Sequence, residues 1–73
     1  MKLMTKMVKR LHRLGYSNIH VNERGYLFTD GEYSYEWETE GEYPYLVVRK
    51  DDKSKVINLS EKEILLFLKK KRL

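Results

Sequence analysis

The stretch GEYSYEWETEGEY, residues 31–43, alternates carboxylates and aromatic side chains almost perfectly. Because successive side chains of a β-strand point to opposite faces, this alternation predicts a strand with one aromatic and one acidic face. The aromatic row is Tyr33, Tyr35 and Trp37, and the acidic row is Glu36, Glu38 and Glu40. The pair Asp30-Gly31 is a strong hairpin turn signal, so this strand is expected to lie antiparallel to the one before it.

Further strand-like segments with turn signals between them lie on both sides of this stretch. The expected strands are residues 19–22 and 26–29 before it, and residues 45–50 and 55–59 after it. Gly25 is expected to be the permissive residue of the first turn, and Asp51-Asp52 to begin the last one. Connections of hairpin length require antiparallel pairing. The sequence therefore predicts an antiparallel meander of 3–5 strands.

A helix is expected at each end of the chain. Residues 2–14 place apolar side chains at helical spacing, and Gly15 follows where a glycine commonly ends a helix. Ser60 and Glu63 match the capping box just before an apolar run, so a second helix is expected from residue 61 to about 72. The predicted fold class is α+β: an N-terminal helix, the meander and a C-terminal helix in a two-layer sandwich, forming one domain over residues 1–73.

Two segments carry more apolar side chains than a two-layer monomer buries. Five successive apolar residues, 64–68, surround the second helix, and residues 45–48 are apolar on both faces of their strand. This excess predicts a homodimer with two-fold symmetry. The expected surface for self-association or for a partner comprises Trp37, Leu46, Val48 and Leu66. Two alternatives remain open: contact between the helices hides Leu66, and Trp37 faces the core of its own chain.

The composition gives little support to an enzyme. The chain of 73 residues has no cysteine, two isolated histidines and four dispersed glycines, which excludes thiolate chemistry and a glycine-rich phosphate loop. The acidic row lacks the concave pocket that carboxylate catalysis requires. We therefore expect no catalytic, cofactor-binding or metal-binding residues. No apolar run approaches the ~20 residues of a membrane span, and no signal peptide is visible, so a cytoplasmic protein without membrane contact is expected.

The charge is distributed unevenly, which raises nucleic-acid binding as an alternative function. Residues 1–22 hold five cations and no acid, residues 23–42 hold seven acids and one cation, and residues 43–73 hold nine cations and four acids. The expected first helix carries a basic stripe, Lys2, Lys6, Lys9 and Arg13, that could contact phosphates. The aromatic row is a poor base-stacking platform, because glutamates rather than cations lie between its members.

Parts of this chain resemble two known families. The helix–sheet–helix order resembles the double-stranded-RNA-binding domain, but SEKEI, residues 60–64, replaces the lysine cluster of that family with a net acidic turn. VKRLHRLGY, residues 8–16, is similar to the start of the HicA ribonuclease toxins. NERGYLFTD, residues 22–30, lacks their catalytic histidine, so that activity does not carry over.

Over its full length the chain looks most like the small YopT-type proteins of Bacillus prophages. The similarity lies in its size, in LGYSNIHVN (residues 14–22), and in YLVVRK and INLSEKE (residues 45–50 and 57–63). This resemblance implies a small prophage-derived α+β homodimer and no particular activity. The sequence thus predicts a non-enzymatic interaction module that pairs with itself or with another protein, and nucleic-acid binding is the alternative.

Overall fold

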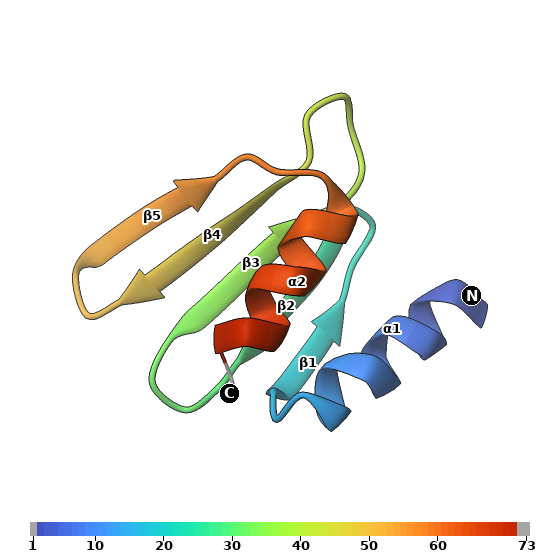
Figure 1. Ribbon diagram of the computed structural model, residues 1–73, viewed down its shortest axis with the longest axis horizontal. Helices are drawn as coiled ribbons and strands as arrows, with labels where there is room; N and C mark the ends of the chain where they lie inside the picture. The colour runs from blue at the N-terminus through green and yellow to red at the C-terminus, as the bar shows by residue number, and fades with distance from the viewer. Residues whose placement is uncertain (1, 72–73) are drawn as a thin grey trace.

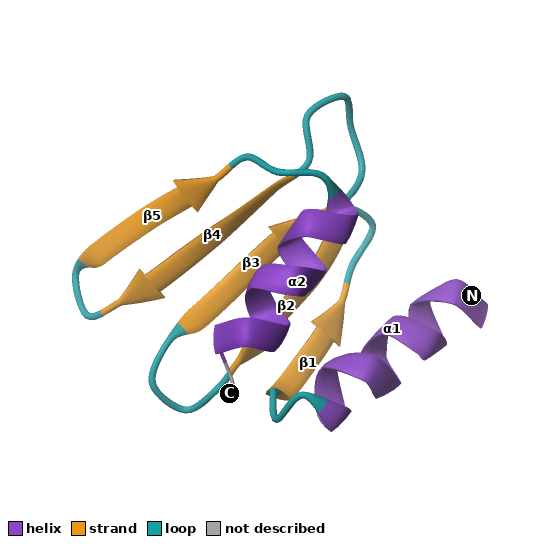
Figure 2. Cartoon of the chain, in the orientation of Figure 1, coloured by secondary structure: helices purple, strands orange, loops and turns teal. Residues whose placement is uncertain are grey.

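A computed structural model describes residues 2–71 of the chain, and side chains within residues 6–70. The elements are α1 (Lys2–Arg13), β1 (Ser17–Val21), β2 (Gly25–Thr29), β3 (Ser34–Glu38), β4 (Tyr45–Lys50), β5 (Lys53–Ile57) and α2 (Glu61–Lys71). The strands form one antiparallel sheet in the order β1-β2-β3-β4-β5. α2 crosses one face of the sheet, and α1 lies next to β1 (Figures 1 and 2). The predicted α+β fold, with its meander and two terminal helices, is confirmed.

The residues that end α1 also link it to α2 through a hydrogen bond. Gly15 has a φ of 100°, and its N–H donates to the His12 carbonyl at 3.0 Å. The Tyr16 N–H donates to the Leu11 carbonyl at 3.0 Å, which completes a Schellman motif. The buried Tyr16 hydroxyl then donates to the Leu68 carbonyl of α2 at 2.8 Å. The glycine stop predicted from the sequence is confirmed, and it places an aromatic side chain beneath α2.

The start of α2 is the predicted capping box. The Glu63 N–H donates to the Ser60 hydroxyl oxygen at 3.3 Å, and the Ser60 N–H donates to the Glu63 carboxylate at 3.3 Å. These two bonds satisfy backbone donors that have no partner within a helix. The predicted end of this helix near Arg72 lies outside the described residues.

The core lies between the sheet and the helices and is largely aromatic. The register aligns Tyr26, Trp37 and Leu46 across three strands, all facing α2. Phe28 and Tyr35 are stacked in the next row, with ring centroids 5.2 Å apart. Burial and the hydrogen bond that Tyr35 donates to Asp30 raise the pKa of that phenol above its ordinary value. The aromatic face of β3, which carries Tyr35 and Trp37, therefore belongs to the core.

This arrangement corrects the predicted partner surface. Trp37 is 1% exposed and Leu46 is 0% exposed, so neither is available to a second chain. Val48 is partly buried against the same core, and only Leu66, at 52% exposure, points into solvent. The prediction was wrong for Trp37 and Leu46 because their side of the sheet is the one that α2 covers.

Gly25 plays a different part from the one predicted. It lies within β2 and is buried, and a Cβ at this position would overlap the Trp37 carbonyl oxygen of β3. The turn before it is made by Asn22, whose side-chain oxygen accepts the N–H groups of Arg24 (2.8 Å) and Gly25 (2.9 Å). Gly25 is required by the close approach of two strands and not by the turn.

Candidate functional site

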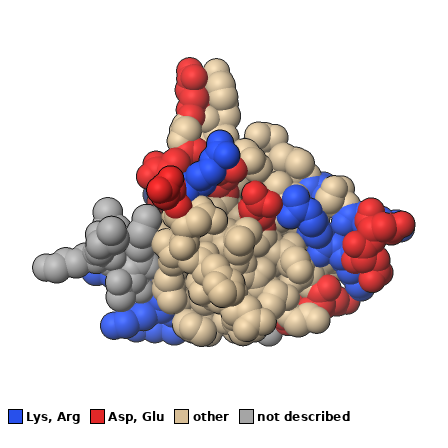
Figure 3. Space-filling model, turned by 180° about the vertical axis from the view of Figure 1, so that it is seen from behind, with Lys and Arg blue, Asp and Glu red and all other residues tan. Residues whose placement is uncertain are grey.

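The face of the sheet opposite α2 is covered by none of the helices and strands that the structure describes (Figure 1). The strand register places one row across all five strands on this face: His20, Leu27, Glu36, Val47 and Val56. Seen from this side, the middle of the molecule carries few charged side chains, and Lys, Arg, Asp and Glu gather around its margin (Figure 3). We call this surface the open face.

The apolar members of the row are partly covered by their neighbours and partly free. Val47, in the central part of the sheet, is 7% exposed, whereas Leu27 is 39% and Val56 is 57% exposed. An antiparallel sheet can leave one face in water, and such a face then carries mainly polar side chains. The open face keeps three aliphatic side chains in the same row as His20 and Glu36, and its next row is polar: Ser17, Thr29, Ser34, Arg49 and Ser54.

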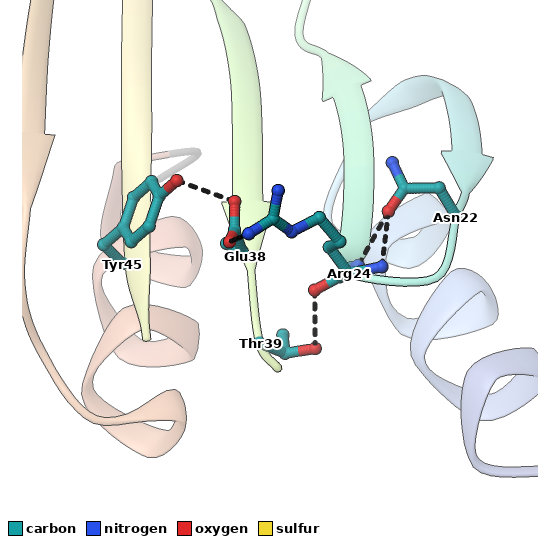
Figure 4. A network of polar contacts seen from close by, with 6 residues as sticks. Asn22, Arg24, Glu38, Thr39 and Tyr45 are labelled. Carbon is teal, nitrogen blue, oxygen red and sulfur yellow. Dashed lines mark hydrogen bonds and ion pairs between the residues drawn. The ribbon is translucent and has the colours of Figure 1, made fainter. Parts of the chain in front are cut away.

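The charged side chains that β3 and β4 place on the open face form ion pairs. Glu36 and Arg49 form an ion pair at 3.1 Å between neighbouring strands. Glu38 pairs with Arg24 at 3.1 Å and accepts a hydrogen bond of 2.6 Å from the Tyr45 hydroxyl (Figure 4). These contacts leave the open face close to electrically neutral, although the chain has a net charge of +4.

The loop between β1 and β2 sets the position of Arg24. Asn22 fixes the backbone on one side. On the other side the Arg24 carbonyl accepts the Thr39 N–H at 2.9 Å and the Thr39 hydroxyl at 3.4 Å, the second of which is drawn in Figure 4. The guanidinium can therefore reach across the end of the sheet to Glu38. The hydrogen bond to Glu38 also raises the pKa of Tyr45, because ionisation of the phenol would place two anions in contact.

The acidic row named from the sequence is only partly exposed to solvent. The Glu36 side chain is 37% exposed, but the Glu38 side chain is only 11% exposed and is held by two partners. Glu40 lies beyond the end of β3 and does not continue the row. The pairing of Glu38 with Arg24 depends on a loop conformation that strand periodicity does not encode.

The predicted nucleic-acid residues lie on α1. Lys6, Lys9 and Arg13 are exposed, whereas the side chain of Lys2 lies outside the described residues. Arg13 also lines a groove between α1 and α2 that includes Leu66. From the sequence, Arg13 was assigned to the basic stripe and Leu66 to the partner surface. The other cations of this groove, Arg10, Lys62 and Lys69, were not predicted as site residues, because they come from distant parts of the chain.

A second basic cleft lies at the turn between β4 and β5, with a volume of about 520 Å³. It is lined by Lys50, Lys53 and Lys55 together with Tyr33 and Phe67. Lys50 is already occupied: it donates to Glu32 at 2.8 Å and lies 5.2 Å from the centre of the Tyr33 ring. The contact with Glu32 raises the pKa of Lys50 and so keeps its ammonium group charged, while the carboxylate of Glu32 offsets part of the positive charge of this cleft.

The described part of the chain holds no group of three or more His, Asp or Glu side chains that could bind a metal ion. Among its helices, neither is both long and apolar enough to span a bilayer. His20, a candidate general base by residue type, is exposed on the open face, in the same row as Leu27 and Val47. Comparisons with protein-family models, with curated proteins and with solved structures found no match for this chain.

Proposed function

We propose that the protein is a non-enzymatic, cytoplasmic interaction module that forms a homodimer through the open face of its sheet. The observation that carries this proposal is that three of the five side chains in the row, Leu27, Val47 and Val56, are aliphatic on a face that no described helix covers. Sheets that pack face to face bury such rows between them. A second copy of the chain is a suitable occupant because it offers the same exposed aliphatic side chains, Leu27 and Val56.

Charge and size support a second copy as the occupant. Two chains of net charge +4 repel each other, so a stable contact requires surfaces without unpaired charge. Glu36 and Glu38 on the open face each have a cationic partner. The molecule measures 33 by 27 Å across its two longer axes (Figure 1), and a standard interface buries about 800 Å² per partner. One broad side of the molecule as a whole therefore has dimensions comparable to those of such an interface.

Val56→Lys is expected to weaken the dimer at least tenfold. Val56 is 57% exposed in the monomer, so the substitution leaves the core intact, but in the dimer it buries an unpaired ammonium group. Sedimentation velocity over a range of micromolar concentrations should show a wild-type species of twice the 8.9 kDa chain mass and a mainly monomeric variant.

Leu66→Lys is the matched control for this experiment. Leu66 is exposed to a similar extent, 52%, but it belongs to α2 on the other side of the molecule. The control should sediment as the wild type does. A wild-type monomer at high micromolar concentration would contradict the dimer, and dissociation by Leu66→Lys alone would move the interface to the helices.

Nucleic-acid binding is the second candidate function. Lys6, Lys9 and Arg13 are exposed on α1 and form no ion pair among the described side chains. If they bind phosphates, a Lys6→Glu/Lys9→Glu variant should lose affinity for duplex DNA or RNA by tenfold or more, and the affinity of the wild type should fall steeply with salt. Equal binding by the two proteins at low and moderate salt would leave the stripe as an ordinary solvated helix face.

A further inference from the structure

A groove with a volume of about 340 Å³ runs between α1 and α2. Its apolar lining comes from Leu14, directly after α1, and from Leu65 and Leu66 of α2, and Leu66 is 52% exposed. Apolar grooves between helices are suited to the apolar stripe of a third helix. The groove lies on the helical side of the molecule, so a ligand bound there does not compete with contacts of the open face.

The polar side chains that line this groove, among those the structure describes, are all cationic: Arg10, Arg13, Lys62 and Lys69. None of the four forms an ion pair among the described side chains, whereas Arg24, Arg49 and Lys50 all do. The helix macrodipole favours Arg13 and Lys69 near C-terminal ends, but it opposes Lys62 in the first turn of α2. The chain therefore keeps a cluster of unneutralised charge around an apolar surface.

The spacing of the cations indicates the shape of a complementary ligand. Lys62 and Lys69 are seven residues apart on one helix, which corresponds to a rise of about 10 Å, or two turns. Carboxylates two turns apart on a bound helix would match this separation. An apolar stripe between them would cover Leu14, Leu65 and Leu66 and remove their exposed surface from water.

We propose that this groove binds an acidic amphipathic helix of a partner protein. Apolar side chains of that helix contact the three leucines, and its flanking carboxylates pair with the arginines of α1 and the lysines of α2. The apolar lining favours a peptide over a nucleic-acid backbone, because phosphates would leave the leucines uncovered. The concave shape favours a peptide over a bilayer, because surface-binding helices project their apolar residues outward into the lipid.

The test uses two labelled helical peptides with identical leucines at positions i, i+3 and i+7, one flanked by glutamates and the other by lysines. Fluorescence anisotropy at moderate salt should show micromolar binding of the acidic peptide and at least tenfold weaker binding of the basic one. Leu66→Ser and Lys62→Glu/Lys69→Glu should each lower the affinity for the acidic peptide at least tenfold, with the helical signal in circular dichroism unchanged.

Lys6→Glu/Lys9→Glu is the matched control, since it changes the net charge equally at exposed positions that do not line the groove. It should bind the acidic peptide within about twofold of the wild type. Equal losses in both charge-reversal variants, or equal binding of the two peptides, would overturn the groove as the site. Displacement of the acidic peptide by anionic vesicles or by duplex RNA at lower concentration would also overturn it, in favour of a lipid or nucleic-acid ligand. Val56→Lys should bind the acidic peptide as tightly as the wild type does, which would show that peptide binding does not depend on the dimer.

Discussion

Trp37→Ala is expected to lower the free energy of unfolding by about 3–5 kcal/mol, the usual cost of truncating a fully buried large aromatic residue. A chain of 73 residues has a total stability of about 4–11 kcal/mol at typical values per residue. The substitution therefore removes a large part of the total, and much of the population should unfold under mild denaturing conditions. Urea denaturation followed by circular dichroism measures the shift in midpoint.

The environment of Trp37 explains the size of this effect. Its side chain is 1% exposed and lies opposite Tyr26 and Leu46 in the sheet, and its ring is centred 5.7 Å from that of Tyr26. α2 covers it with Ile64 and Leu68, both 0% exposed. Removal of the indole would leave a cavity in the contact between sheet and helix, which neighbouring aromatic rings cannot readily fill.

Trp37→Phe is the matched control for the alanine variant. The Trp37 Nε1 atom is buried and has no hydrogen-bond partner in the described part of the chain. Phenylalanine therefore loses volume but breaks no hydrogen bond, and a cost of about 1–2 kcal/mol is expected. If Trp37→Ala instead kept the urea midpoint and only dissociated an oligomer, Trp37 would belong to an interface and not to the core.

Local sequence signals predicted the elements well because each has a nearby physical cause. Gly15 ends α1 through its own backbone conformation, and Ser60 with Glu63 begins α2 through contacts within one turn. The alternation of residues 31–43 fixed which side chains of β3 share a face. The predicted boundaries of β1 and β5 were less accurate, because both strands begin two residues earlier than expected, at Ser17 and Lys53. β1 also contains an irregularity near Asn18, whose φ is 50°.

Periodicity could not show which face of the sheet the helices cover. Residues 45–48 are apolar on both sides, so Leu46 and Val47 looked equally suited to a core. The register places Leu46 beside Trp37 under α2 and Val47 beside Glu36 on the open face. The predicted interface was assigned to the wrong side because the sequence alone does not place α2.

The groove between the helices depends on contacts between the two ends of the chain. Arg10 and Arg13 are separated from Lys62 and Lys69 by about 50 residues, and no local pattern connects them. The cluster exists because α1 is anchored to α2 through Tyr16 and Leu68. The dimer is a prediction that sedimentation tests, and the groove ligand is a prediction that peptide binding tests. The resemblance to YopT-type prophage proteins also stays a prediction.

Gly25→Ala is expected to destabilise the protein by about 3 kcal/mol, at the upper end of the usual cost of overpacking. Gly25 pairs with Glu38 in the hairpin of β2 and β3, and an added methyl group would overlap the Trp37 carbonyl. The Thr39 nitrogen lies 3.1 Å from the same position. Both obstacles are backbone atoms, so no rotation of a side chain relieves the overlap, and the strands must separate locally.

The same movement would disturb the open face, because Arg24 precedes Gly25 and pairs with Glu38. Gly41→Ala is the matched control: nothing lies within 4 Å of an added Cβ, so its cost, about 1–2 kcal/mol, comes only from the strain of an alanine at a φ of 101°. Urea midpoints of the two variants should therefore differ clearly although the chemical change is identical. Equal midpoints would mean that glycine is needed at position 25 only for its backbone conformation, as expected from the sequence. They would also mean that β2 and β3 can separate at little cost in free energy. A larger loss at position 25 would show that close strand contact requires this glycine.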